Sequence, residues 1–315
     1  MVANRYWRPA LIGAVLAVLG ACTAGGPAPL PSPSAAHAML AATEYGPAKP
    51  RAVILAAHGF GDHGTSTFGR AAEAWAARGI ATRAVDLRGF GRNPSRGVWP
   101  GADRLVADLR AETTKIRGRH PCVPLILLGH SMGGGLALAA APALPLDGLV
   151  LAAPAIWGGD ALNPLHRSAA WLAAFVAPQR RFTGRGVIRI QASDNIEMLR
   201  ALARDPLRHG PPSARELMGL VRVTDRAAEA APNVATPALL LLGERDQIVP
   251  NSAVERVFAQ TAGPRDVHLY PAGWHMLFRD LQAPTVWQDV GDWTLARERP
   301  EGCTRPDAVL ASRYG

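Results

Sequence analysis

Three residue types that together perform nucleophilic catalysis occur in this chain at wide spacing. Ser131 lies in Gly129-His130-Ser131-Met132-Gly133, and this G-x-S-x-G pattern is typical of a serine held on a sharp strand-to-helix turn. Asp246 lies in "GERDQIVP" and His275 in "PAGWHML". A serine hydroxyl needs a base to become a nucleophile, and the base needs an acid to orient it. The order Ser, Asp, His therefore predicts acyl transfer with Ser131 as nucleophile, His275 as base and Asp246 as orienting acid.

Other carboxylates and histidines compete for these roles. Glu244 could be the acid, but it lies nearer the end of the preceding predicted strand, whereas Asp246 begins the expected turn. The remaining histidines are given no catalytic role: His268 is assigned to a strand interior, His130 is expected to point away from the nucleophile, and His209 and His120 are expected to be solvated.

A glycine-rich segment, "AAHGFGDHG" at residues 56–64, fits two kinds of site. Its G-x-G-x-x-G spacing after an apolar run is that of a dinucleotide-binding loop. It could instead present a backbone N–H to a developing oxyanion. The dinucleotide interpretation leaves the Ser–Asp–His set unexplained, so we favour an oxyanion hole formed by the N–H groups of Phe60 and Met132. Asp86 is then expected to support the neighbouring turn rather than bind a ribose.

The elements that must position these residues alternate between strand and helix. Strands are predicted at 53–57, 80–86, 125–128, 149–153, 238–242 and 267–270, and helices at 66–78, 103–117 (with Asp103 as N-cap), 132–141, 252–260 and 285–297. Repeated β-α units predict an α/β protein, a mostly parallel sheet with helices on both faces. Ser131, Asp246 and His275 each follow the carboxyl end of a strand, so they should converge on one edge of the sheet.

A helical, proline-punctuated stretch interrupts this alternation. Residues 154–235 are predicted to form an inserted cap, between core segments 38–153 and 236–300, with a tail at 301–315. Within the cap, "HRSAAWLAAFV" at 166–176 is apolar. One helical face of it, formed by Trp171, Leu172, Phe175 and Val176, is expected either to line an acyl-chain channel or to pack the cap onto the core.

The N-terminus has the features of an export signal. Arg5 and Arg8 precede an apolar run, which ends in Leu19-Gly20-Ala21-Cys22. Small residues directly before a cysteine resemble the lipobox of bacterial lipoproteins, which predicts a signal peptide at 1–21, a lipidated Cys22 and a flexible tether at 22–37. An ordinary signal peptide or an uncleaved anchor are the alternatives. Thr23 after the cysteine favours the outer membrane, if the cell has one.

Composition limits the partners that the chain could bind. The 315 residues are 48% apolar and 19% charged, with a net charge of +9 carried almost entirely by arginine. The charges are scattered and form no basic run with interleaved aromatics, so no nucleic-acid partner is predicted. The charge is explained either by attraction to anionic lipid head groups or by a general bias toward arginine over a solvated surface.

The cysteines raise a separate question. If Cys22 carries lipid, Cys122 and Cys303 remain, and in an exported protein they either pair or stay free.

Together these motifs resemble one branch of a known family. The segments "HGFGDH", "DLRGFGR", "GHSMGG", "LLGERDQIVP" and "GWHMLF", with the D-P-L triplet of the cap, are similar to the monoacylglycerol lipase and lysophospholipase-like branch of the α/β-hydrolases. Phe90 stands where histidine is common. Only residues 38–49 are available for the leading strand pair of the family, with 38–45 as the best strand candidate, so a single edge strand is expected.

The resemblance implies an α/β-hydrolase fold and serine-dependent hydrolysis of carboxylic esters. The expected substrates are monoacylglycerol-like or lysophospholipid-like lipids, without a metal or organic cofactor. Esterase action on small esters, or aminopeptidase action with the same residues, remains the alternative. A lipoprotein that keeps the fold only as a binding module is the non-enzymatic alternative.

Overall fold

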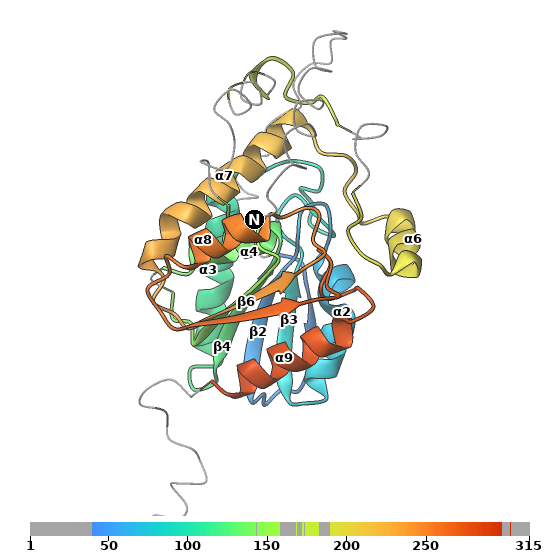
Figure 1. Cartoon of the computed structure of the whole chain (residues 1–315). Helices are drawn as coiled ribbons and strands as arrows, with labels where there is room; N and C mark the ends of the chain where they lie inside the picture. Colours follow the sequence, from blue (N-terminus) through green and yellow to red (C-terminus); the bar gives the residue numbers. More distant parts are fainter. Residues whose placement is uncertain are drawn as a thin grey trace, which may run out of the picture.

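A seven-stranded sheet forms the centre of the molecule (Figure 1). The computed structural model describes residues 40–142, 144–157, 168, 172, 174–182, 190–297 and 303. The strands, given in chain order, are β1 (Ala42–Tyr45), β2 (Ala52–Ala57), β3 (Ile80–Val85), β4 (Leu125–His130), β5 (Gly148–Ala152), β6 (Ala238–Gly243) and β7 (Arg265–Tyr270). Their spatial order is β1-β3-β2-β4-β5-β6-β7. Only β1 runs antiparallel to its neighbour, β3. The predicted α/β class is therefore confirmed.

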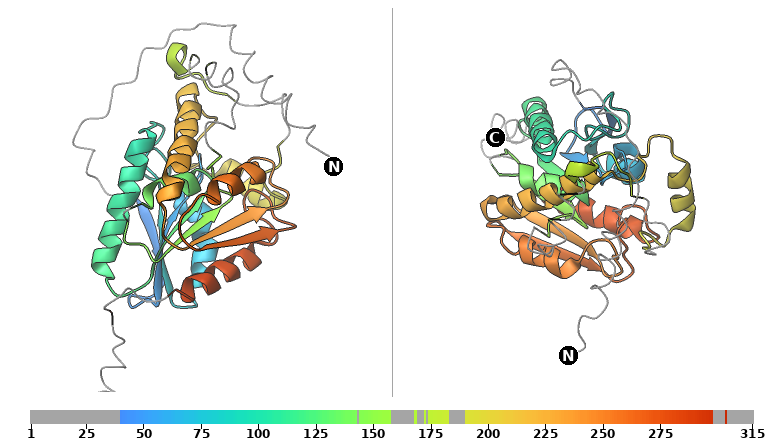
Figure 2. Two further views of the ribbon diagram at one scale, coloured as in Figure 1. Left: turned by 60° about the vertical axis from the view of Figure 1, so that its left-hand side comes forward. Right: turned by 90° about the horizontal axis from the view of Figure 1, so that it is seen from above.

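Helices cover both faces of this sheet. Along β2, Val53 and Leu55 belong to one core cluster and Ile54 to the other, because successive side chains of a strand point to opposite faces. Both faces of the sheet are buried from solvent, which explains the continuous apolar run in the sequence of β2. Helices α3 (Ala102–Arg119), α4 (Met132–Ala140) and α8 (Asn251–Phe258) bury side chains in the first cluster, and α2 (Gly64–Ala76) and α9 (Ala283–Leu295) in the second. Figure 2 shows α3 and α9 on opposite sides of the sheet.

The part of the cap that the structure describes includes two helices and a short 3₁₀ turn. These are α6 (Ile196–Arg204), α7 (Ala214–Ala230) and η4 (Ala231–Asn233). Helix α7 packs on α4 and buries Val223 and Ala227 in the core cluster. Its start is fixed by a capping box, in which Ser213 and Glu216 each bond to the other's backbone. Helix α6 lies at the side of the molecule, away from α7 (Figure 1).

Two local expectations change in the structure. Asp103 is not an N-cap: α3 begins at Ala102, and Gly101 takes the capping position with φ +95°, a value that suits glycine. The Asp103 carboxylate instead pairs with Arg226 of α7 at 3.1 Å. The same helix was predicted to end at residue 117, but it continues to Arg119. As expected, one strand, β1, forms the leading edge of the sheet among the residues that the structure describes.

The two remaining cysteines are bonded to each other. Cys122 and Cys303 form a disulfide with a Cα–Cα distance of 5.3 Å, which answers the question the sequence left open. The predictions for residues 1–21, 22–37, Cys22 and Trp171 lie outside the described residues. None of the helices that the structure describes combines the length and the apolar character needed to cross a bilayer.

Candidate active site

Ser131 stands on a strained turn between β4 and α4. Its backbone has φ 53°, in the left-handed region that non-glycine residues seldom adopt. Neighbouring glycines make the turn possible. A Cβ on Gly129 would lie 2.2 Å from the carbonyl oxygen of Gly133, and a Cβ on Gly133 would lie 2.1 Å from the carbonyl oxygen of Ala57. The helix can therefore approach the strands closely only with glycine at both positions.

The structure brings the three predicted residues into one chain of hydrogen bonds. The hydroxyl of Ser131 lies 3.0 Å from Nε2 of His275, and Nδ1 of His275 lies 2.8 Å from Oδ2 of Asp246. The side chain of Asp246 is fully buried and that of His275 is 6% exposed. Glu244, the alternative acid, is exposed. These contacts have the geometry of a nucleophile, a base and an orienting carboxylate.

Asp246 is held in its charged form. Burial alone would raise the pKa of its carboxyl, but the hydrogen bond and charge of His275 and the backbone N–H groups of Val249 and Ile248 keep that pKa below its usual value. The carboxylate therefore accepts the Nδ1–H of His275 and leaves Nε2 free to accept a proton from Ser131.

His130 has a contact that the sequence analysis missed. Its ring is buried, and Nε2–H donates to the backbone carbonyl of His275 at 2.8 Å. Burial lowers the pKa of His130 to about 3, so the ring is neutral. His130 therefore holds the main chain of His275, a role that the sequence analysis did not assign to it. No local pattern indicates this bond, because the two residues are 145 positions apart.

The two predicted oxyanion donors are the backbone amides of Met132 and Phe60. Met132 is the first residue of α4, where backbone N–H groups have no partner within the helix. Gly59, next to Phe60, passes so close that a Cβ on it would lie 3.2 Å from Cβ of Ser131. Within the described part of the chain, the Phe60 amide donates to no backbone acceptor. Met132 therefore follows Ser131 directly, and Phe60 follows a residue that lies close to it, as an oxyanion hole requires.

Residues 58–64, which we call the oxyanion loop, are fixed by buried polar contacts. The Nδ1–H of His58 donates to the Gly59 carbonyl at 2.7 Å, and the Leu87 amide donates to Nε2 of His58 at 2.9 Å. Burial lowers the pKa of His58, consistent with this neutral tautomer. On the other side, Asp62 pairs with Arg279, four residues after His275. The loop is thereby tied to both β3 and the segment that carries His275.

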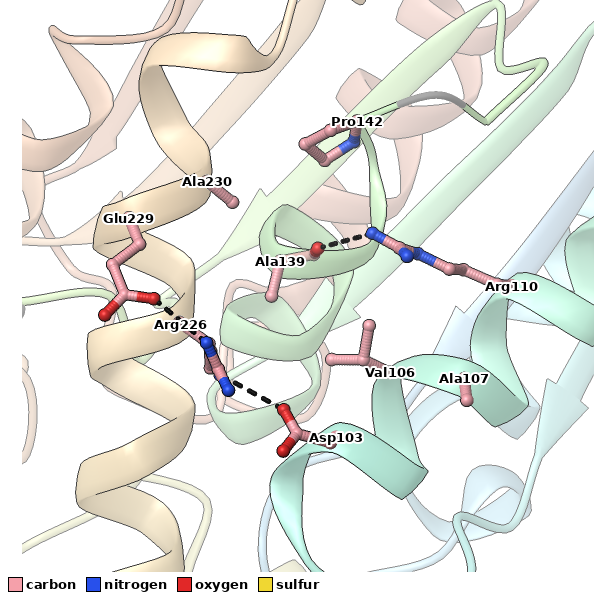
Figure 3. A pocket seen from close by; sticks show the side chains of 9 residues that line it. All are labelled: Asp103, Val106, Ala107, Arg110, Ala139, Pro142, Arg226, Glu229 and Ala230. Carbon is pink, nitrogen blue, oxygen red and sulfur yellow. Dashed lines mark hydrogen bonds and ion pairs between the residues drawn. The ribbon is translucent and has the colours of Figure 1, made fainter.

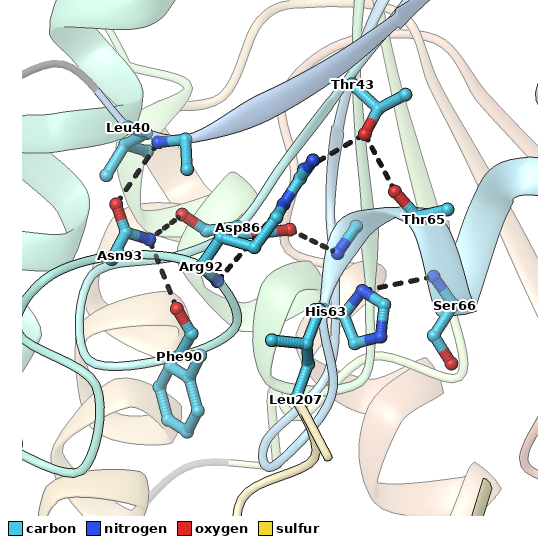
Figure 4. A network of polar contacts seen from close by, with 12 residues as sticks. Leu40, Thr43, His63, Thr65, Ser66, Asp86, Phe90, Arg92, Asn93 and Leu207 are labelled. Atoms are coloured by element: carbon cyan, nitrogen blue, oxygen red, sulfur yellow. Dashed lines mark hydrogen bonds and ion pairs between the residues drawn. The ribbon is translucent and has the colours of Figure 1, made fainter. Parts of the chain in front are cut away.

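Asp86 supports the loops around the site, as expected. Its carboxylate accepts hydrogen bonds from the Gly64 amide and from the backbone and side chain of Arg92. Figure 4 shows Asp86 between Arg92 and Asn93, whose side-chain amide donates to the Asp86 carbonyl. Asp86 therefore fixes the start of α2 to the turn after β3.

The predicted cap residues are only partly described, and one histidine was misplaced. Leu172, Phe175 and Val176 are 53%, 74% and 69% exposed, so these three do not pack the cap onto the core. His209, which was expected to be solvated, is buried instead: its side chain is 6% exposed and lies 2.9 Å from Glu216. The hydrogen-bonding partner that Glu216 provides makes burial of this polar ring possible.

Two surface hollows lie elsewhere. One of about 450 Å³ lies among α3, α4 and α7 and is crossed by the Arg226 ion pairs (Figure 3). The other, about 430 Å³, lies between α2 and α9. Neither is lined by Ser131, Asp246 or His275. Among the described residues, no group of three histidine, cysteine or carboxylate side chains could hold a metal ion.

A parallel sheet of this order, with a strained serine after a central strand and histidine and aspartate after later strands, defines an α/β-hydrolase. The profile of the family described as "Serine aminopeptidase, S33" matches residues 48–282. The chain belongs to that family.

Known relatives and structures agree with this assignment. A monoacylglycerol lipase of Mycolicibacterium smegmatis is 29% identical over 78% of this chain and 89% of its own. The monoglyceride lipase of Rattus norvegicus is 27% identical over 79% and 84%. Among solved structures, the monoacylglycerol lipase of Paleococcus ferrophilus has a TM-score of 0.70 at 20% identity, covering 82% of this chain and 99% of that chain. The predicted resemblance to the monoacylglycerol lipase branch is confirmed.

Proposed function

We propose that this protein hydrolyses carboxylic esters of the monoacylglycerol type through an acyl-enzyme on Ser131. The observation that carries the proposal is the buried hydrogen-bond chain from Ser131 through His275 to Asp246. The curated relatives, which are monoacylglycerol lipases covering more than three quarters of this chain, support the ester class and the lipid substrate.

The geometry supports a two-stage mechanism. Ser131 Oγ attacks the ester carbonyl while Nε2 of His275 takes its proton, and the oxyanion that forms accepts hydrogen bonds from the Phe60 and Met132 amides. His275 then gives the proton to the leaving alcohol. A water molecule repeats the attack on the acyl-enzyme, with the same base, and releases the acid. Asp246 stabilises the imidazolium in both stages.

Covalent labelling tests the proposal directly. A fluorophosphonate probe should label the wild-type protein at one site. Ser131→Ala should not be labelled, and its ester turnover should fall by several orders of magnitude. A panel of monoacylglycerols, lysophospholipids, p-nitrophenyl esters and aminoacyl anilides then identifies the substrate class. Turnover of anilides above esters would favour the aminopeptidase alternative. Near-normal turnover in Ser131→Ala would refute the acyl-enzyme.

We also propose that the mature protein is a membrane-anchored lipoprotein of the cell envelope, with the lipid on Cys22. Support comes from the Leu19-Gly20-Ala21-Cys22 junction and the basic and apolar segments before it. Attachment through more than one acyl chain gives stable binding to a bilayer. The anchor would hold the enzyme at the surface where lipid esters are found.

A further inference from the structure

A short segment of the cap is bonded to the oxyanion loop. We call residues 205–209 the strap. Near its beginning, Asp205 Oδ2 accepts a hydrogen bond from Nε2–H of His63 at 2.8 Å. At its end, the His209 amide donates to the Gly61 carbonyl at 2.9 Å. The strap is thus bonded to the oxyanion loop at Gly61 and at His63, directly after Phe60.

The His209 side chain packs against the residue that carries the oxyanion donor. Its ring meets Phe60 edge to face, with centroids 5.8 Å apart and planes at 89°. It meets Phe90 in the same way at 5.7 Å and 82°. Phe60 and Phe90 also contact each other at 5.3 Å. Trp99 also packs against Phe60, with centroids 6.3 Å apart. Because edge-to-face contacts fix the relative orientation of rings, His209 and Phe90 orient the Phe60 side chain within this cluster.

The His209 ring is itself fixed from the cap side. Its Nε2 lies 2.9 Å from Oε1 of Glu216, and both side chains are almost fully buried. The other oxygen of Glu216 accepts from the Ser213 amide and hydroxyl, so the carboxylate belongs to the capping box of α7. Arg181 Nη1 also lies 3.4 Å from Nε2, but its shorter bond, 2.8 Å, is to the Pro211 carbonyl. His209 therefore connects the first turn of α7 to Phe60.

We propose that His209 is a positioning residue for the oxyanion hole. The inference rests on the proposed function, because it assigns His209 the task of holding the Phe60 amide where the oxyanion forms. His209 contacts Phe60 through its ring and the next residue, Gly61, through its backbone amide, so displacement of the cap at this point changes the direction of the Phe60 N–H. Substrate affinity does not depend on that direction, whereas stabilisation of the transition state does.

Two substitutions separate this role from simple cap packing. His209→Ala removes the ring from Phe60, whereas His209→Phe keeps an aromatic edge there and loses the contact with Glu216. Loss of a complete oxyanion donor costs roughly 100-fold or more in kcat, so misplacing one should cost about tenfold. We expect His209→Ala to lower kcat about tenfold with KM little changed, and His209→Phe to restore most of the loss. The exposed neighbour Arg208 provides the matched control, Arg208→Ala, with wild-type kinetics.

The readouts should report on the oxyanion itself. The loss in His209→Ala should be equal for p-nitrophenyl acetate and for a long-chain ester, because both form the same oxyanion. A trifluoromethyl ketone, whose hemiketal oxygen occupies the hole, should bind more weakly by the same factor as kcat. In a double-mutant cycle, Phe60→Ala and His209→Ala should be strongly non-additive in kcat, because both act through one contact.

Different experimental outcomes would refute the role of His209 and the proposed function of the protein. If His209→Ala raised KM and left kcat and ketone affinity unchanged, His209 would serve access to the site and not the oxyanion hole. The inference would equally fail if the effects of Phe60→Ala and His209→Ala simply added. End-point fluorophosphonate labelling of His209→Ala should remain stoichiometric, since Ser131 and His275 are intact. Absence of labelling and ester turnover in the wild type would instead refute the proposed function.

Discussion

The neutral ring of His130 contributes to the site through both its hydrogen bond and its lack of charge. Its centroid lies 5.1 Å from that of His275. A positive charge at this distance would oppose the imidazolium that forms on His275 during attack. Burial keeps the pKa of His130 near 3, so no such charge is present at neutral pH. His275 is therefore held by His130 at its backbone and by Asp246 at its ring.

Substitution of His130 tests this support. His130→Phe removes the donor to the His275 carbonyl while keeping a ring of similar size in a buried space. Loss of one hydrogen bond of about 1 kcal/mol that positions the base should lower kcat roughly five- to tenfold, with a smaller change in KM. His268→Phe, the same replacement on the partly exposed edge strand β7, is the matched control. Unchanged kcat in His130→Phe would show that Asp246 alone positions the base.

Residue types could be predicted from sequence where chemistry restricts them. Ser131, Asp246 and His275 were identified because acyl transfer requires these residue types and the expected fold has them in this order, and the structure places them in contact. The contacts of His130 and His209 could not be predicted, because each depends on where a distant segment lies. Phe90, which was noted only as a departure from the family pattern, is buried and packs against both Phe60 and His209.

The apolar stretch of the cap leads to a prediction for an element. Leu172 and Phe175 are exposed, and if they guide acyl chains toward Ser131, Leu172→Asp or Phe175→Asp should raise KM steeply for long-chain esters. Acetate esters should be nearly unaffected. Each methylene removed from an apolar contact is worth roughly 0.8 kcal/mol, so the loss should grow with chain length.

The measurement is a series of p-nitrophenyl esters from two to sixteen carbons, with a thermal melt of each variant. Ile190→Asp, at another exposed apolar position of the cap segment, is the control and should leave the chain-length dependence unchanged. A loss of equal size along the whole series would contradict a role in binding acyl chains.

The turn after His275 contains the carboxyl group of Asp280, whose titration should change the free energy of unfolding with pH. Burial, together with the charge of Asp194, raises the pKa of Asp280 to about 6. Asp280 accepts the Trp274 amide, next to His275. Because this pKa is higher in the folded than in the unfolded chain, the group's contribution to stability is complete below about pH 4 and is lost as the pH rises toward 6.

Asp280→Asn should remove this dependence and keep an acceptor for the Trp274 amide. Denaturant unfolding of both proteins between pH 4 and pH 8 measures the difference. The wild type should lose stability relative to the variant as the pH rises, by on the order of 2 kcal/mol at pH 7. Parallel stability curves for the two proteins would show that the pKa of Asp280 is the same in the folded chain as in the unfolded chain.

Elements were predicted well where apolar periodicity is strong and less well at their ends. Strands β2 and β6 are apolar throughout because both faces of the sheet are covered. The start of α3 was misjudged because a capping aspartate looked suitable, whereas Gly101 could adopt the required backbone and free Asp103 for Arg226. Helix ends depend on such tertiary partners, which local sequence does not contain.

The position of the whole molecule in the cell follows from the proposed anchor. Cys22→Ser should abolish incorporation of a clickable fatty acid and leave either soluble protein or an uncleaved precursor. Cys303→Ser, which changes another cysteine, should keep the label. Absence of label on the wild-type protein would contradict lipidation. The folded domain should keep its esterase activity without the anchor, because the site lies entirely within residues after 57.

The mostly parallel sheet with helices on both faces was predicted from the alternation of strands and helices, but the order of its strands and the long-range disulfide were not. Cys122 and Cys303 are 181 residues apart, and no local pattern indicates that α3 ends beside the segment after α9. The pairing depends on the completed fold, in which both lie within bonding distance.

That disulfide makes the chain between Cys122 and Cys303 a closed ring, which contains Ser131, Asp246 and His275. A protease that cuts one peptide bond within the ring, for instance in the cap, releases no fragment. The nicked protein keeps its full mass until a reductant separates the two pieces. An enzyme exposed to foreign proteases at a cell surface would thus keep its nucleophile, base and acid in one covalent molecule after its first cleavage.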